Sequence, residues 1–317
     1  MEPEDLFEFS GGCCKFLVAT KERRARTRNM NTPSQTPPRS ADQVAADALT
    51  KAGWFFPAYL SRGYVMEIAR KVRDAPPDER TKVLEVEIAA TYSEPKHLAV
   101  MVEERYLRWP YIEDHAAVVS EVFEAHALGL HHVATTALLP VVEGTLRGLA
   151  TTLNLPPQRR GMPALVKRVL VEIEKRLEAV ENEQVRSERL VLIHSFRTFV
   201  EERFWQNTKN LPSGETLNRH SILHGLAGST AFARALNFGR LVSVLDMLCF
   251  WIAFFPPHPD RHLSALPPDP TMRSIVRAQH YDVSGTLAAA SRAASAKATA
   301  HIASVQPGGT ALRTKGD

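Results

Sequence analysis

The residues most able to do chemistry lie in one stretch, 217–225, which reads Leu-Asn-Arg-His-Ser-Ile-Leu-His-Gly. Arg219 can hold a phosphate through two parallel N–H bonds and stays charged at physiological pH. His220 and His224 can each give or take a proton near neutral pH. Asn218 adds an amide beside them, and no other stretch is as chemically concentrated. Together these groups could cleave a phosphodiester without a metal.

This stretch resembles the Arg-x4-6-His motif of the HEPN superfamily, small all-helical domains often found as ribonuclease toxins and phage-defence effectors. Arg219 matches the motif arginine, His220 the polar residue after it, and His224 the motif histidine. Asn218 and Gly225 extend the likeness to the Asn-Arg-His-x-x-x-His-Gly ending of uncharacterised bacterial proteins with HEPN-like C-terminal halves. A handful of further positions, in residues 53–57 and 138–144, spread the likeness over roughly residues 50 to 255.

The resemblance implies a metal-independent endoribonuclease that serves as a toxin or phage-defence effector. Arg219 would hold the scissile phosphate and stabilise the charge that builds on it. His224 would act as general base or acid on a ribose 2′-OH or on the leaving 5′-oxygen. Asn218 or His220 would orient these partners. No cofactor is expected, and the expected partners are RNA, a second copy of the chain and an antitoxin protein.

Glu143 is a supporting candidate on a predicted apolar helix. Gly144, the next residue, would let another helix approach closely while the carboxylate stays available. Glu143 could then pair with Arg219 or His224 and orient it, as acidic positions on early HEPN helices can. Alternatively, Glu143 could be an exposed side chain, or it could pair with Arg147 one turn further on.

The spacing of the motif bears on the oligomeric state. A regular helix turns 100° per residue, so Arg219 and His224 would lie about 140° apart around the axis. Either Arg219 stands at the helix N-cap, where its direction is free, or the site is completed across a dimer. The resemblance implies that the second arrangement is common, and symmetric dimers are the commonest oligomers in general. We therefore expect a homodimer with two facing motif copies.

Two other interpretations of the motif stay open. His220 and His224 share one face of a helix and could bind a metal, with Glu143 or Asp246 as third ligand. However, the Glu that follows the first His in metalloproteases is missing, and no metal site is predicted. In the other interpretation, Arg219 and the histidines form a buried structural network in a non-catalytic binding module.

Composition is that of an ordinary globular protein, with 317 residues, 44% hydrophobic and 23% charged. The net charge is +4, and residues 261–317 alone hold seven Lys/Arg against three Asp/Glu. The rest of the chain is therefore neutral, and no broad basic field indicates nucleic acid. Three cysteines form neither a disulfide framework nor a zinc set, which predicts a reducing cytoplasm.

The N-terminus is acidic and lacks the apolar segment of a signal peptide, and Met30 is a second plausible start. The most apolar run, 241–255, contains Asp246 and is shorter than the ~20 residues that a membrane-spanning helix needs. It is predicted to be a buried helix, and no membrane partner is expected. A buried Asp246 needs a partner, and Arg219, Arg240 or a helix N-terminus could supply it.

The spacing of apolar residues and the positions of Pro and Gly predict an all-α protein. We expect a helical bundle in which a HEPN-like C-terminal domain is preceded by a smaller helical layer. The expected parts are a disordered tail in 1–40, an N-terminal helical region in 41–110, the HEPN-like domain in 111–257, and a Pro-rich linker with a low-complexity tail in 258–317.

Local signals place several of the expected elements. Ser40 is expected to cap a helix that runs toward Lys51, and residues 54–57 should be buried between helices. The clearest periodicity, in 163–180, predicts an amphipathic helix. Most of four neighbouring histidines are expected at the surface or at helix caps because their spacing matches no common metal set: His115, His126, His131 and His132.

Overall fold

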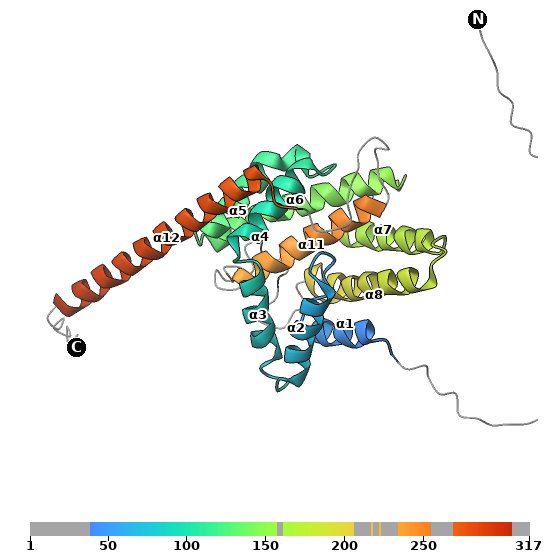
Figure 1. The fold of residues 1–317 in the computed structure, drawn as a ribbon, viewed down its shortest axis with the longest axis horizontal. Coiled ribbons are helices and arrows are strands. Elements are labelled where there is room, and N and C mark those ends of the chain that lie inside the picture. The colour runs from blue at the N-terminus through green and yellow to red at the C-terminus, as the bar shows by residue number, and fades with distance from the viewer. Residues whose placement is uncertain are drawn as a thin grey trace, which may run out of the picture. The chain divides into compact units, whose positions relative to one another are not determined.

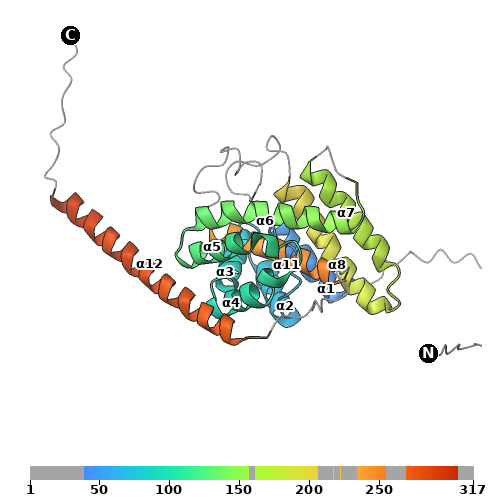
Figure 2. The same ribbon diagram turned by 90° about the horizontal axis from the view of Figure 1, so that it is seen from above.

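The computed structural model describes residues 39–156, 161–205, 234–254 and 269–305, together with Leu217 and Ile222. Within these ranges every regular element is a helix, which confirms the all-α prediction (Figures 1 and 2). The α-helices are α1 Ala41–Lys51, α2 Arg62–Asp74, α3 Arg80–Thr91, α4 Pro95–Glu104, α5 Ala116–Ala127, α6 His131–Thr152, α7 Met162–Leu177, α8 Glu183–Phe199, α11 Ala235–Phe254 and α12 Met272–Val305. Shorter elements are the 3-10 helices η1 Tyr106–Arg108 and η2 Glu113–His115 and the π-helix η3 Val200–Phe204. Residues 1–38 of the expected disordered tail lie outside the described part.

Two of the predicted helices are present, although the second ends at Leu177 and not at residue 180. The Ser40 hydroxyl accepts a hydrogen bond from the Gln43 backbone N–H at 3.2 Å, and the Gln43 side chain accepts one from the Ser40 N–H at 2.9 Å. This capping box satisfies two backbone donors at the start of α1. Helix α7 confirms the amphipathic helix, because its periodic apolar positions are buried: Val166, Leu170, Ile173 and Leu177.

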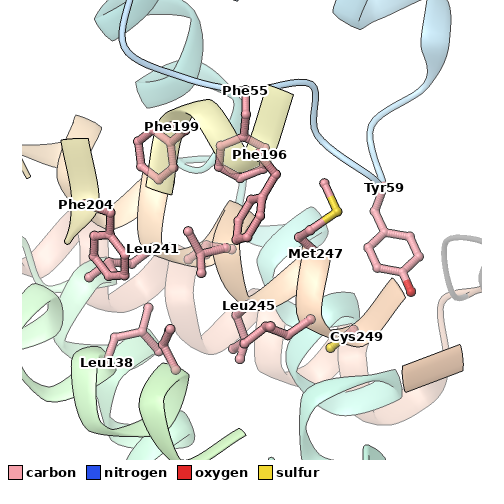
Figure 3. Close-up of a cluster of buried hydrophobic side chains, with 14 of the residues drawn as sticks. Phe55, Tyr59, Leu138, Phe196, Phe199, Phe204, Leu241, Leu245, Met247 and Cys249 are labelled. Carbon is pink, nitrogen blue, oxygen red and sulfur yellow. The ribbon is translucent and has the colours of Figure 1, made fainter. Parts of the chain in front are cut away.

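Helix α11 lies in the hydrophobic core and contains the predicted buried run. Leu241 and Leu245 are fully buried, and Figure 3 shows them in a cluster of buried side chains that also includes Leu138 of α6. Among the described residues, one stretch, Ala235–Ala253, is long and apolar enough to cross a membrane, and 89% of it is buried inside the protein. The prediction of a buried helix is therefore confirmed.

Aromatic side chains join the loop after α1 to α8 and α11. Trp54 and Phe55 are fully buried, as the sequence predicts. The Phe55 ring lies 5.0 Å from the rings of both Phe196 and Phe199 on α8 (Figure 3). Phe196 also meets Trp251 of α11 edge to face at 5.0 Å. Such pairs add roughly 0.5–1.5 kcal/mol each to the stabilisation from burial alone.

The expected N-terminal region and the expected HEPN-like domain share this core. Helix α1 packs against α8, and α3 packs against α11. Gly239 allows the second contact, because a Cβ on it would overlap Ile88 of α3 and lie 2.9 Å from Tyr92 Cδ2. The chain from Arg39 onward forms one compact unit. A domain boundary between residues 110 and 111 stays a prediction.

The expectation of a linker and tail over 258–317 is wrong for residues 272–305, which form the 34-residue helix α12. The Ala/Ser/Thr-rich composition suggests a tail, but alanine is also the strongest helix former. Arg277 binds Glu103 of α4 at 2.5 Å and donates to Ser120 of α5 at 2.9 Å. Beyond these contacts, residues 289–300 are all exposed, and Figure 2 shows this end of α12 extending past α5.

We predict that Gly239→Ala destabilises the protein by about 1–3 kcal/mol, because the added methyl group overlaps Ile88 and overpacks the core. Gly285→Ala in α12 is the matched control. A Cβ there lies 3.5 Å from the Ala127 carbonyl oxygen, an ordinary contact, so helix propensity should stabilise this variant by up to ~1 kcal/mol. Urea denaturation measures both. Equal stability of Gly239→Ala and the wild type would show that α3 and α11 do not meet this closely.

Candidate functional site

The motif stretch enters the described structure at two residues. Leu217 is 1% exposed and Ile222 is 8% exposed, and both belong to the hydrophobic core. The stretch that carries the motif therefore contacts the core on both sides of Asn218–Ser221. The expected catalytic and supporting residues of the motif lie outside the described residues: Asn218, Arg219, His220 and His224.

Glu143, the supporting residue on α6, is described and is 6% exposed. Its interpretation as an exposed side chain is therefore wrong. Arg147 lies one turn on, with its Nη2 3.6 Å from Glu143 Oε2, and the Arg147 side chain is 63% exposed. The close approach expected at Gly144 is confirmed, because a Cβ there would lie 2.5 Å from His115 Nε2 in η2. Pairing of Glu143 with Arg219 or His224 stays a prediction.

A second group of polar side chains lies inside the core, around Asp246 of α11. The Tyr106 hydroxyl donates a hydrogen bond to Asp246 Oδ1 at 2.5 Å. Arg105, the preceding residue, is 1% exposed and places its guanidinium 3.1 Å from the centre of the Tyr59 ring. Among the described residues, the buried hydrogen-bond partner of Asp246 is Tyr106 and not Arg240. Pairing of Asp246 with Arg219, which lies outside the described residues, stays a prediction.

Burial raises the pKa of Asp246 to about 7, against the opposing effects of the Arg105 charge and the Tyr106 hydrogen bond. The pKa of Tyr106 is raised well above its usual value by burial and by the nearby Asp246. Shifts of this size often mark catalytic groups. Here Tyr106 is 0% and Asp246 3% exposed, so a substrate cannot reach them in this conformation. The pair joins η1 to α11 and has a structural role.

Ser243, three residues before Asp246, connects three segments. Its hydroxyl lies 2.7 Å from the Tyr92 hydroxyl at the end of α3 and accepts a hydrogen bond from Trp54 Nε1 at 3.3 Å. It also donates to the Gly239 carbonyl oxygen at 2.9 Å. The sequence does not predict this network, because the tyrosine and tryptophan partners of Ser243 lie far away in the chain.

Arg240 is a third buried polar residue of α11, at 5% exposure. Burial, Arg203 and Arg234 lower its pKa to about 9, while Glu85 acts in the opposite direction. The described hydrogen bond of its guanidinium is to the Asn237 side chain at 3.5 Å. Burial disfavours the charged form of this guanidinium and is the largest cause of its lowered pKa.

His126 departs from the expectation for the neighbouring histidines, because it is buried rather than at the surface. Its ring stacks on Phe238 with centroids 3.8 Å apart, and Nε2 lies 2.9 Å from the Tyr92 carbonyl oxygen. Burial lowers the pKa of His126 to about 4, and the nearby His131 adds to the effect. His126 is therefore neutral at physiological pH and belongs to the core.

Comparison with protein-family models, with curated proteins and with solved structures finds no match to this chain. The HEPN resemblance stays a prediction from the sequence. In the described ranges, no three His, Cys, Asp or Glu side chains are grouped closely enough to hold a metal ion. The alternative metal site includes His220 and His224, which lie outside those ranges, and it stays open.

We predict that Asp246 makes stability depend on pH between about 4 and 7. In this window the native carboxyl holds its proton while the unfolded one, with a pKa near 3.8, has lost it. The free energy of unfolding of the wild type, measured relative to Asp246→Asn, should then fall by roughly 1.4 kcal/mol per pH unit as pH rises, and level off above pH 7. Urea denaturation at several pH values measures this difference.

Both proteins contain His126, so its opposite dependence, in which stability is lost as pH falls from 6.5 toward 4, cancels in the comparison. Tyr106→Phe provides a control with a known sign. Loss of its hydrogen bond to the carboxylate should raise the pKa of Asp246 further and move the upper end of the window to higher pH. A difference that does not vary with pH would contradict the assignment.

Proposed function

We propose that this protein is a metal-independent endoribonuclease of the HEPN type that acts in the cytoplasm as a toxin or phage-defence effector. The observation that carries the proposal is the Asn218-Arg219-His220-x3-His224 sequence in a stretch whose Leu217 and Ile222 are buried in the core. A stretch in contact with a rigid core can hold catalytic side chains more accurately than a free segment can.

In the proposed reaction, a general base removes the proton from a ribose 2′-OH, and the 2′-oxygen attacks the adjacent phosphorus. The bond from phosphorus to the 5′-oxygen breaks, and a general acid gives that oxygen a proton. His224 serves as one of these two groups. Arg219 binds the non-bridging oxygens and stabilises the charge that builds on them. The products carry a 2′,3′-cyclic phosphate and a 5′-hydroxyl, so DNA cannot react.

Glu143 is proposed to orient Arg219 or His224. Helix α6, which carries it, packs against α11, and α11 begins ten residues after the end of the 217–225 stretch. The carboxylate is buried, whereas its described partner Arg147 is mostly exposed and lies at 3.6 Å.

We predict that His224→Ala lowers the rate of RNA cleavage by about 10²–10⁴-fold, because it removes a general acid or base. Purified protein is incubated with end-labelled single-stranded RNA in the presence of EDTA. Fragments ending in 2′,3′-cyclic phosphate should appear with the wild type and be absent when the 2′-OH at the cleavage position is replaced by hydrogen. Induced expression should arrest growth and fragment cellular RNA only with the wild type.

The control for this test is His194→Ala, which removes an exposed histidine that lies 3.3 Å from Glu174. Its cleavage rate and melting temperature should match those of the wild type. Cleavage by His224→Ala at the wild-type rate would rule out the proposed mechanism. Loss of wild-type cleavage on addition of EDTA would also rule it out.

The proposed homodimer predicts complementation between two inactive variants. If each site takes Arg219 from one protomer and His224 from the other, a mixed dimer of Arg219→Ala and His224→Ala contains one complete site. Refolding an equal mixture should then restore about a quarter of the wild-type activity, since half of the dimers are mixed and each has one of two sites. No recovery from the mixture, with wild-type activity recovered after the same refolding, would place both residues of a site in one protomer.

A second candidate function is a non-catalytic binding module in which the motif is structural. The observation that favours it is that α11 already buries three polar residues in the core, namely Arg240, Ser243 and Asp246. Melting of Arg219→Ala/His224→Ala separates the two. Loss of folding would support the structural role, whereas unchanged melting with loss of cleavage supports the nuclease.

A further inference from the structure

A basic pocket lies along α1, beside the end of α2 and the start of α3. It has a volume of about 220 Å³ and is lined by four cationic side chains, Arg39, Lys51, Arg73 and Arg80, with one carboxylate, Asp47. Figure 1 shows α1, α2 and α3 side by side, and contacts join α1 to α2 and α2 to α3. The pocket is therefore formed by packed helices.

The charges of the pocket are not balanced within the described structure. Arg39 pairs with Asp47 at 2.5 Å, and Arg73 pairs with the neighbouring Asp74 at 3.0 Å. Lys51 and Arg80 have no carboxylate within 4 Å among the described residues. Two positive charges thus remain, which matches the charge of about −1.5 to −2 on a phosphate monoester at neutral pH.

Arg80 is held in position before any ligand arrives. Its Nε donates to the Ala75 carbonyl oxygen at 3.2 Å, and its Nη2 donates to the Arg73 carbonyl oxygen at 3.4 Å, which satisfies two acceptors at the end of α2. Nη1 donates to no described group. A guanidinium fixed in this way loses little conformational entropy on binding an anion, and its remaining N–H groups suit phosphate oxygens.

The size of the pocket limits the ligand. Pockets for drug-sized molecules have volumes of about 300–1,000 Å³, so about 220 Å³ fits a phosphate group and part of its attached sugar rather than a whole dinucleotide. Val44 and Ala48 add an apolar side to the lining, next to which a ribose carbon chain can lie.

We propose that this pocket binds the terminal phosphate of a nucleotide, either a free nucleoside monophosphate or the 5′-phosphorylated end of an RNA strand. Lys51 and Arg80 bind the phosphate oxygens, and the Arg39–Asp47 pair lies at the edge. The choice of a nucleotide among phosphate monoesters rests on the proposed ribonuclease function; the affinity for a dianionic phosphate does not.

The test measures binding by fluorescence anisotropy, with the full chain carrying His224→Ala so that RNA stays intact. Two labelled single-stranded RNAs of one sequence are compared, with a 5′-phosphate or a 5′-hydroxyl. We expect the phosphorylated RNA to bind about tenfold more tightly, as is typical of a hydrogen-bonded charge pair. Lys51→Gln, an exposed residue without a described side-chain bond, should abolish this preference. Arg80→Gln should do so as well, provided that its melting temperature is unchanged.

Lys82→Gln is the matched control, because it removes an equal charge from an exposed position on α3 outside this pocket and should keep the preference. Competition distinguishes the sources of the phosphate. Adenosine monophosphate is added at the same concentration as the RNA. Displacement of the RNA identifies a mononucleotide site, and resistance to displacement identifies a site for an RNA end. Equal binding of the two RNAs, or equal loss in Lys82→Gln and Lys51→Gln, would overturn the proposal.

These outcomes are independent of the nuclease test. If the wild type does not cleave RNA but Lys51→Gln removes a preference for phosphate, the ribonuclease proposal fails and the pocket assignment stands. If the wild type cleaves RNA and no preference for phosphate is found, the pocket assignment fails alone.

Discussion

The burial of polar groups on α11 is the constraint on which the rest of the described structure depends. A helix this apolar could pack against almost any hydrophobic surface. The buried side chains of Ser243 and Asp246, however, need hydrogen-bonding partners. Tyr92, Trp54 and Tyr106 meet this need from three different segments. Each lies more than 130 residues from its partner in the chain, so these contacts specify how the N-terminal helices sit on α11.

Arg240 shows that this core also contains an unfavourably placed charge. Its guanidinium is almost fully buried near two other arginines, and its lowered pKa reports the unfavourable environment of the charge. Space for it comes from Gly53, whose φ of 87° is a conformation that glycine adopts without strain and whose missing Cβ would lie 3.0 Å from Arg240 Nη2. The loop after α1 is therefore shaped by a cation on α11, which ties the two parts of the chain together a second time.

The sequence predicts those features that depend on near neighbours. Helix α7 was predictable because its apolar positions repeat every three or four residues, and the start of α1 because Ser40 and Gln43 lie within one turn. Composition alone does not predict helix α12, because Ala, Ser and Thr are frequent both in tails and, in the case of alanine, in helices. The partner of Asp246 could not be predicted, because Tyr106 is 140 residues away and nothing local to either residue points to the other. The motif shows the same limit, since residue types near Arg219 indicate chemistry while orientation depends on the packing of distant helices.

Solvent access is what separates a structural cation from a functional one in this protein. Arg105 and Arg240 are buried away from solvent. The guanidinium of Arg105 lies over the Tyr59 ring, and that of Arg240 donates a hydrogen bond to the Asn237 side chain. Such a group cannot bind RNA without opening the core. Arg80 differs because protein carbonyl oxygens hold one edge of its guanidinium while the pocket remains open beside it. An arginine that binds a scissile phosphate has to satisfy the second condition: fixed by the protein, yet able to exchange water for an anion. Leu217 and Ile222 are buried in the core. By the same argument, the role proposed for Arg219 requires a side chain that the protein holds in place and that water can reach.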